Sequence, residues 1–323
     1  MSFVKTLAKV LATTALVSSA TAAMSADIAV IGGSNDDAFW NIIKKGIDDA
    51  TPGVVANGGS VNYLRLVNYD NFAPDVVQLI RTAISMEVDG LVIPNWVPEA
   101  EDPAIKDAVA AGITVILMNA GGADKAKELG AINYVGSDEY VAGLAGGEYF
   151  GKGGQKNVLC INTLPGAANT EARCKGVIEG VVAAGGKGAQ LPLPTTSFGD
   201  ATAVAEAIKA ELLKDDTIDG VITISAGDAD SAAIAVDQAG KTGKTILGSF
   251  DMNQAGLDRI KAGTQAFAID QQPYLQSYLA VSLLASAIDF GTDLPVFPVL
   301  TGPGIVDASN IDATLAGVAK GAR

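Results

Sequence analysis

A regular alternation of predicted strands and helices occurs twice along this chain, and it restricts the fold to a few architectures. Ten short apolar segments have the composition of buried strands, and they fall into two sets of five. Anchors at residues 28, 61, 90, 115 and 133 give spacings of 33, 29, 25 and 18 residues, and anchors at 158, 190, 221, 246 and 266 give 32, 31, 25 and 20. Strands that alternate with helices at this period predict two doubly wound α/β domains with parallel sheets of one topology. The predicted strands are 28–31, 61–66, 90–94, 113–118, 132–135, 158–161, 190–193, 221–224, 245–247 and 266–269, and the predicted helices are 71–86, 104–111, 140–150, 171–184, 203–213, 230–239 and 253–262.

Length and composition agree with two such domains. The 323 residues suffice for two α/β units, and 49% hydrophobic with 18% charged residues supports large buried cores. Residues 1–26 have the form of a cleaved secretory signal peptide, because Lys5 and Lys9 flank the start of an apolar segment and small residues follow it. That segment, 10–17, is too short to span a bilayer, and a short N-terminal anchor is the alternative. We therefore expect a soluble protein exported to the periplasm.

The charge of the chain limits its partners. The formal net charge is −14, and it becomes −16 once Lys5 and Lys9 are removed with the signal peptide. Such acidity argues against nucleic acid or an anionic membrane surface as the main partner.

The chain contains no histidine, which excludes several kinds of chemistry. Ser-His-Asp and Cys-His catalysis, imidazole zinc sites and acid–base work by histidine are all ruled out. Carboxylate chemistry remains, and Asp36, Asp37 and Asp251 form the candidate set for an exported glycoside hydrolase. Because the sequence has neither a Walker-type phosphate loop nor a contiguous EF-hand loop, we expect no cofactor and no metal.

Two cysteines, Cys160 and Cys174, leave two interpretations open. Cys160 lies at the end of a predicted strand, and Cys174 lies in the helix that follows. In an oxidising compartment such a pair can form a disulfide that adds roughly 3 kcal/mol of stability. Two buried free thiols are the alternative.

The stretch from residue 26 to residue 46 carries the most information about a site. Gly32 and Gly33 are predicted to end the first strand, and polar residues follow, including Asp37, which can cap the next helix. Phe39 and Trp40 then stand in the first helical turn. They are either core residues or the apolar wall of a polar ligand site.

Polar and aromatic residues recur where the predicted strands end. In open parallel sheets, ligands bind at the carboxyl ends of the strands, and two facing sheets would place these ends on either side of one cleft. Carboxylates and amides pair with hydroxyl groups, while aromatic faces cover the C–H surface of a sugar, so the set suits a neutral polyhydroxyl ligand. The predicted ligand-binding residues are Asp37, Phe39, Trp40, Asn119, Asn169, Arg173, Ser225, Asp228, Asp251 and Gln271.

With these features the chain resembles a known family, the periplasmic sugar-binding proteins of bacterial ABC transporters. It is most similar to the ribose-binding type, in a cluster that also includes autoinducer-2 binders. The resemblance covers nearly all of the chain after the signal peptide. The stretches IAVIGGSNDDAFW, TVILMNA, NTEARCKG, GVITISAGD, GSFD and AIDQQP are similar to the family's ligand-contacting segments. Two departures stand out, since Ala120 replaces an arginine common in the family and Ser225 replaces a longer amide.

The resemblance implies the type I periplasmic binding protein fold, with two Rossmann-like domains joined by a three-segment hinge. Its crossovers are expected near Ser137, near Gln271 and Gln272, and around 301–304. The N-terminal lobe would comprise 27–136 and 272–301, and the C-terminal lobe 137–271 and 302–323. The resemblance also places Cys160 and Cys174 on a neighbouring strand and helix, which predicts a disulfide between them.

The resemblance implies the partners as well. The protein would be a monomer that is not an enzyme and that delivers its ligand to a permease in the inner membrane, with a chemoreceptor as a further candidate partner. Repressors of the lactose-repressor family share this core, but the signal peptide, the acidity and the missing helix-turn-helix segment argue against that class.

Charge predicts the class of ligand. Asp37, Asp228 and Asp251 are carboxylates, whereas Arg173 is the clear cation of the set, and we expect it to donate several hydrogen bonds to ligand hydroxyls. Burying carboxylates is costly unless the ligand supplies donors. We therefore predict a small neutral monosaccharide or polyol, with an amino sugar or an autoinducer-2-type ligand as the alternative, and we expect sugar acids and sugar phosphates to be excluded.

Overall fold

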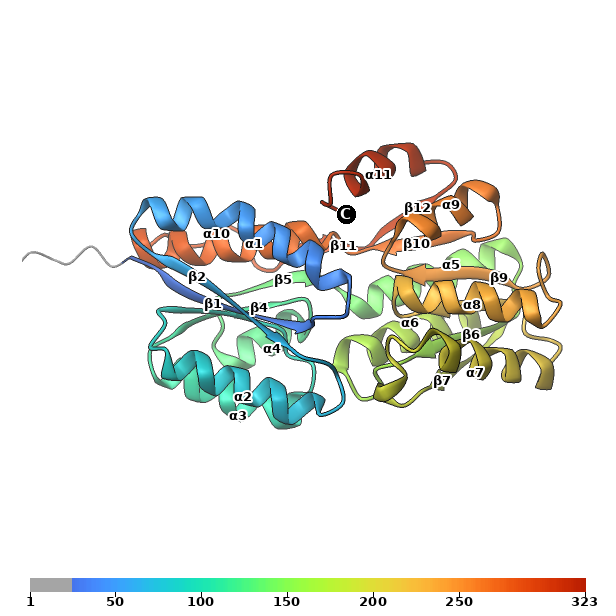
Figure 1. Ribbon diagram of the computed structural model, residues 1–323, viewed down its shortest axis with the longest axis horizontal. Coiled ribbons are helices and arrows are strands. Elements are labelled where there is room, and N and C mark those ends of the chain that lie inside the picture. The colour runs from blue at the N-terminus through green and yellow to red at the C-terminus, as the bar shows by residue number, and fades with distance from the viewer. Residues whose placement is uncertain (1–24) are drawn as a thin grey trace, which may run out of the picture.

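The computed structural model describes residues 25–323 and shows two α/β lobes side by side (Figure 1). Each lobe contains a six-stranded sheet, and the strand orders are β11-β5-β4-β3-β1-β2 and β12-β10-β9-β8-β6-β7. All described pairings are parallel except that of β10 with β12. The prediction of two sheets with one topology is confirmed. The strands are β1 (Asp27–Ser34), β2 (Ser60–Leu66), β3 (Gly90–Ile93), β4 (Thr114–Met118), β5 (Asn133–Ser137), β6 (Asn157–Asn162), β7 (Lys187–Pro192), β8 (Gly220–Thr223), β9 (Ile246–Phe250), β10 (Phe267–Asp270), β11 (Val299–Gly302) and β12 (Gly304–Asp307).

Helices cover both faces of each sheet (Figure 1). In the first lobe, α1 packs with α10 on one face and α2 packs with α3 on the other, and in the second lobe α5 pairs with α6 and α7 with α8. One long helix that the sequence did not predict, α10, has apolar residues on all its sides, so no helical periodicity marks it in the sequence. The helices are α1 (Phe39–Ala56), α2 (Phe72–Ser85), α3 (Pro98–Ala110), α4 (Gly122–Leu129), α5 (Glu139–Gly153), α6 (Ala168–Ala183), the 3₁₀ turn η1 (Thr195–Ser197), α7 (Ala201–Lys214), α8 (Ala226–Gln238), α9 (Gln254–Ala262), α10 (Pro273–Phe290) and α11 (Ile311–Val318).

The first strand is longer than predicted, because it does not end at Gly32. Gly32 pairs with Arg65 of β2, and the pairing continues past an irregularity to Ser34. A Cβ on Gly33 would lie 2.2 Å from Nε1 of Trp40. Glycine at this position therefore lets the indole ring pack directly on the strand, which orients the loop that follows.

The chain passes between the two sheets three times. It crosses after β5, where Ser137 ends the strand, then between β10 and α10 at Gln271 and Gln272, and finally between β11 and β12. Thr301 Oγ1 donates a hydrogen bond to the carbonyl of Gln271 at 2.8 Å, and Gln272 Nε2 donates one to the carbonyl of Thr301 at 2.6 Å. These contacts tie two of the crossings together. We propose lobe limits of 27–136 with 272–301 and of 137–271 with 302–323.

The only helix–strand cross-link described in residues 25–323 joins α6 to β6. Cys160 and Cys174 form a disulfide in the structure, with their Cα atoms 5.6 Å apart and both side chains fully buried. We predict that the denatured, unreduced protein shows no free thiol in a thiol titration and two free thiols after reduction. Replacing both cysteines with alanine should lower the free energy of unfolding by about 3 kcal/mol. Two free thiols before reduction would contradict the prediction.

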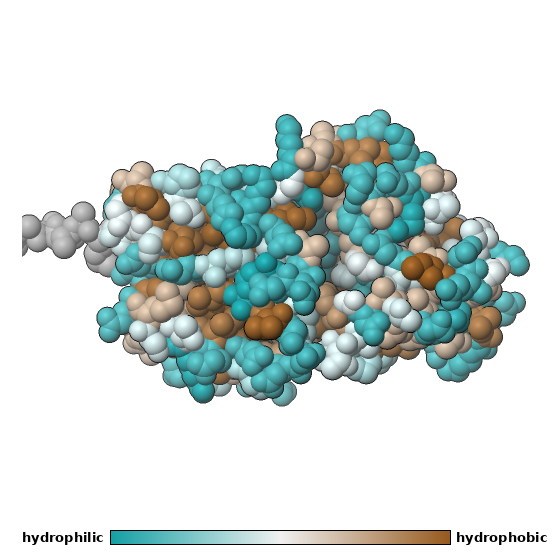
Figure 2. Space-filling model, viewed as in Figure 1, coloured by the Kyte–Doolittle hydropathy of each residue, from teal (hydrophilic) through white to brown (hydrophobic). Residues whose placement is uncertain are grey.

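None of the helices in the described part of the chain is long and apolar enough to cross a membrane. The predicted signal peptide lies outside the described residues, apart from positions 25 and 26. Hydrophilic residues cover most of the face of both lobes that is seen in Figure 2, and hydrophobic residues form small separate groups on it.

Candidate functional site

A cavity of about 440 Å³ lies between the lobes, where the carboxyl ends of both sheets meet. The lobes touch beside it. The N–H of Ala168 donates to the carbonyl of Trp96 at 2.7 Å, and the rings of Tyr69 and Phe198 pack edge to face with centroids 4.8 Å apart. The cavity is therefore bounded by a direct contact between the lobes, as in a closed cleft.

Nine of the ten predicted ligand residues line this cavity. Five strand–helix units from both lobes supply them, although the residues span more than two hundred positions of the sequence. Their contact with a ligand remains a prediction. The nine are Asp37, Phe39, Trp40, Asn119, Asn169, Arg173, Ser225, Asp228 and Asp251.

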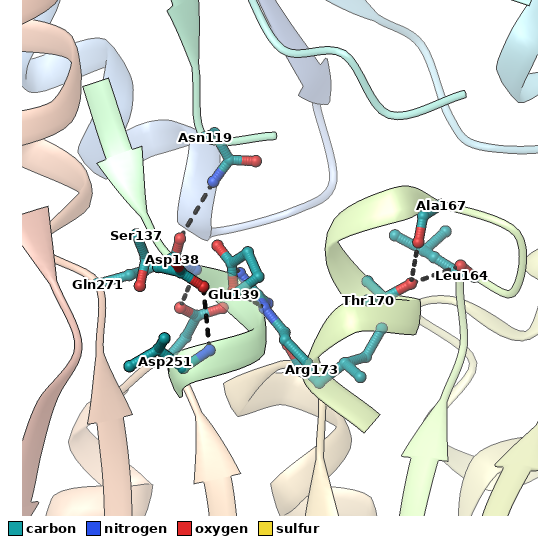
Figure 3. Close-up of polar contacts among 12 residues, drawn as sticks. Asn119, Ser137, Asp138, Glu139, Leu164, Ala167, Thr170, Arg173, Asp251 and Gln271 are labelled. Carbon is teal, nitrogen blue, oxygen red and sulfur yellow. Dashed lines mark hydrogen bonds and ion pairs between the residues drawn. The ribbon is translucent and has the colours of Figure 1, made fainter. Parts of the chain in front are cut away.

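The tenth residue, Gln271, lies behind the lining and connects two members of the site. Its Nε2 donates to Oδ1 of Asp251 at 2.6 Å, and its Oε1 accepts from Nδ2 of Asn119 at 3.1 Å (Figure 3). Asn119 follows β4 and Asp251 follows β9, the equivalent strand of the second lobe, and both have positive φ angles of 67° and 61°. Gln271 does not line the cavity, and its amide holds these two side chains in place, so its contact with a ligand stays a prediction.

The loop after β1 holds Asp37 through neutral donors. The N–H of Phe39 donates to its Oδ1 at 3.0 Å, and the hydroxyl of Tyr69 donates to its Oδ2 at 2.9 Å. Tyr69 in turn accepts from Nε1 of Trp40 at 3.0 Å. Burial raises the pKa of Asp37, and these hydrogen bonds partly oppose the rise. Trp40 belongs both to the core and to the cavity wall, so the two interpretations of this ring are not exclusive.

The cavity arginine is paired with a residue that sequence reasoning did not identify. Arg173 Nε donates to Oε2 of Glu139 at 2.6 Å and its Nη2 donates to Oε1 at 3.2 Å, while Nη1 donates to the carbonyl of Ile224 at 2.9 Å (Figure 3). Three of the five guanidinium N–H groups are therefore used inside the protein. Two N–H groups therefore remain for a ligand, and the contact of Arg173 with ligand hydroxyls stays a prediction.

Close packing of α5 on α6 creates this pair. A Cβ on Gly143 would lie 2.1 Å from the carbonyl oxygen of Arg173, and a Cβ on Gly176 would lie 2.2 Å from that of Tyr140. The two glycines let the helix backbones touch, which brings Glu139, the first residue of α5, against Arg173 of α6. Burial raises the pKa of Glu139, and the adjacent guanidinium counters the rise by favouring the carboxylate.

Two further carboxylates of the second lobe have neutral partners, and one of them, Asp228, is buried while the other, Asp251, is partly buried. Asp228 accepts from Thr163 Oγ1 at 2.7 Å, and burial raises its pKa to about 6. Asp251 accepts from Gln271, and burial raises its pKa to about 7 against the opposing effect of Arg173. Both carboxyl groups therefore bind a proton more readily than an exposed aspartate does.

Ser225 and Asn169 differ in whether their side-chain oxygens already accept a hydrogen bond within the protein. Ser225 caps α8 by accepting from the N–H of Asp228 at 3.1 Å, so its hydroxyl has a structural task. Asn169 is only 8% exposed, and its Oδ1 has no hydrogen-bond donor in the described part of the protein. A buried acceptor without a donor is costly, so this oxygen is suited to a ligand hydroxyl.

The structure adds residues to the site that the sequence did not reveal. Tyr69 and Glu139 position predicted residues, while Arg323 and Asp270 line the hinge side of the cavity and lie 3.3 Å apart as an ion pair. A signal for Glu139 was present in the glycines spaced four apart in both α5 and α6, which predict close helix contact. No group of three or more potential metal ligands occurs within residues 25–323.

Comparison with known proteins agrees with this geometry. The family profile described as "Periplasmic binding protein domain" matches residues 28–293. The chain belongs to this family. A carbohydrate transporter from Acidothermus cellulolyticus 11B, solved in complex with myo-inositol, is 35% identical to it with a TM-score of 0.84, over 93% of this chain and 100% of that one.

Two more distantly related sugar-binding proteins are also similar to this chain. The xylose/arabinose-binding protein XylF of Sulfolobus acidocaldarius is 28% identical over 264 residues, which are 74% of this chain and 62% of that protein, so the chain spans about three fifths of the length of this curated relative. An ABC transporter solute-binding protein from Burkholderia graminis C4D1M, solved with D-arabinose, is 25% identical with a TM-score of 0.76, over 90% of this chain and 97% of that one. The family and the fold expected from the sequence are thus confirmed.

Proposed function

We propose that this protein is the solute-binding component of an ABC importer and that it binds a small neutral polyol or monosaccharide in the cleft. The observation that carries the proposal is the lining of the cavity. Asp37, Asp228 and Asp251 offer acceptors, and none of them forms an ion pair with any lysine or arginine of residues 25–323. A ligand rich in hydroxyl donors satisfies such acceptors without adding charge.

The aromatic residues support the same class of ligand. Phe39 and Trp40 stand edge to face with centroids 5.2 Å apart, and Trp96 packs on Trp40 at 5.4 Å. All three line the cavity, so they offer apolar surface beside the carboxylates. A cyclic polyol has both kinds of surface, C–H groups on its faces and hydroxyls at its rim. The myo-inositol complex of the 35% identical relative makes cyclitols the first ligands to test.

The same proposal includes a transport partner. Ligand contacts on both lobes would favour the closed form, because a ligand shifts the equilibrium by as much as its affinities for the two forms differ. A membrane permease would recognise that closed form and receive the ligand. We propose that the protein acts in the periplasm as a monomer, with a chemoreceptor as a second candidate reader of the closed form.

The proposal predicts a stabilising effect of neutral polyols. Addition of myo-inositol, or of a pentose such as D-arabinose, should raise the free energy of unfolding by about 2.7 kcal/mol at 100 times its Kd. A thermal-shift screen followed by calorimetry measures this effect. Sugar phosphates serve as the matched comparison, and we expect them not to bind. Binding of acidic sugars alone would contradict the proposal, and release of a glycoside aglycone would instead favour the hydrolase alternative built on Asp36, Asp37 and Asp251.

A further inference from the structure

We infer that Glu139 sets the charge selectivity of the cleft, so that it admits polyols carrying an ammonium group and rejects polyols carrying a carboxylate. The inference rests on the proposed function, because it concerns the ligands of the same cavity. It gives a role to a residue that does not line the cavity itself.

Glu139 occupies one of the two edges of Arg173 that can bind a carboxylate and neutralises its charge. An arginine recognises a carboxylate best through two parallel N–H groups. In this protein Nε and Nη2 of Arg173 are directed at the two oxygens of Glu139, at 2.6 and 3.2 Å (Figure 3). The two residues are only 3% and 7% exposed, so solvent does not weaken the pair. An acidic ligand would have to compete with an internal carboxylate that is already in position.

The pairing also leaves the three predicted ligand-binding carboxyl groups of the cavity without a cationic partner in the described structure. Arg173 is neutralised by Glu139, and the other cavity arginine, Arg323, lies 3.3 Å from Asp270. Asp37, Asp228 and Asp251 have only neutral hydrogen-bond partners in the described structure. The cavity therefore holds several carboxylates and no cation that lacks a carboxylate partner among residues 25–323. A cation in the ligand would offset this imbalance.

The hydrogen-bonding groups of the cavity also favour a ligand with an ammonium group. An ammonium group supplies three donors and no acceptor, whereas a hydroxyl supplies one donor and also needs donors itself. Oδ1 of Asn169 lacks a donor, and Asp251 Oδ2 accepts no hydrogen bond from the described residues, so both oxygens can accept from a ligand. An ammonium group on the ligand could donate to both of them.

The wild-type protein provides the first test. Calorimetry at neutral pH compares myo-inositol with an amino-deoxy-inositol, and glucose with glucosamine and glucuronic acid. We expect the amine of at least one pair to bind at least as tightly as its neutral counterpart and glucuronic acid to bind at least about a hundredfold more weakly than the neutral sugar that binds best. Binding of neutral polyols with rejection of both amines would overturn the inference and leave the proposed function intact. Binding of no polyol at all would remove the proposed function.

The substitution Glu139→Gln tests the residue itself. Glutamine keeps the size and one acceptor but releases the charge of Arg173, so the affinity for glucuronic acid relative to the best neutral ligand should rise at least tenfold, and the preference for the amine should fall. Glu179→Gln is the matched control, because this exposed glutamate on α6 accepts from Tyr140 on α5 and does not line the cavity. An unchanged affinity ratio in a folded Glu139→Gln protein would overturn the inference. If that variant does not fold, the wild-type comparison decides.

Discussion

Replacing Arg173 with alanine is expected to destabilise the protein by about 3–5 kcal/mol and to weaken polyol binding at least about tenfold. The loss of stability follows because Glu139 would remain buried without its cation. The loss of affinity follows because the two N–H groups of Arg173 that the protein does not use are the charged donors of the cavity wall. Urea unfolding measures the first effect and calorimetry the second.

A double variant separates these two effects. Arg173→Ala combined with Glu139→Gln removes the orphaned charge, so most of the stability should return while the affinity stays low. Such strong non-additivity is expected for a buried pair and absent for distant residues. Recovery of full affinity in the double variant would show that Arg173 acts on the ligand only through the stability of the fold. The ligand contact predicted for this residue would then be wrong.

The fold could be predicted because its central strands are buried on both faces. Segments such as 28–31 and 115–118 are apolar without interruption, which marks them in the sequence whatever their neighbours are. Strand limits depend on pairing instead, so β1 extends to Ser34 through contacts with β2 that no local pattern shows. The helix α10 escaped prediction for a related reason, since a helix that is apolar on all sides has no periodic signal.

The sequence could predict the residues that line the cavity but not the residues that support them from behind. Residues at strand ends point into the cleft by topology, and nine of the ten predicted positions lie on its wall. Contacts behind the wall depend on how helices and crossings pack. Glu139 meets Arg173 because glycines bring α5 onto α6, and Gln271 turns toward Asn119 and Asp251 because the chain crosses between lobes there. Glu139 changes the charge of the site, and Gln271 holds two of its side chains in place. Their positions cannot be predicted from residue type alone.

One consequence of the buried carboxylates is a stability that should fall as the pH rises. Burial raises the pKa of Asp251 to about 7 and that of Asp228 to about 6 in the folded protein, whereas an unfolded aspartate titrates at about 3.9. Between these values the folded state binds more protons than the unfolded state, so the free energy of unfolding decreases with increasing pH. The stabilising contribution is complete below about pH 4 and is lost as the pH passes through about 7.

The substitution Asp251→Asn should remove the upper part of this pH dependence, because asparagine resembles the protonated acid at every pH. We compare the thermal midpoints of the ligand-free variant and the ligand-free wild type. The difference between them should grow in favour of the variant by at least about 3 °C from pH 5 to pH 8. Asp258→Asn, at an exposed position on α9, is the matched control and should give a difference that does not change with pH. Parallel curves for wild type and Asp251→Asn would contradict the prediction. A widening gap would identify Asp251 as a carboxyl that is protonated in part near neutral pH and therefore able to donate as well as accept a hydrogen bond to a polyol.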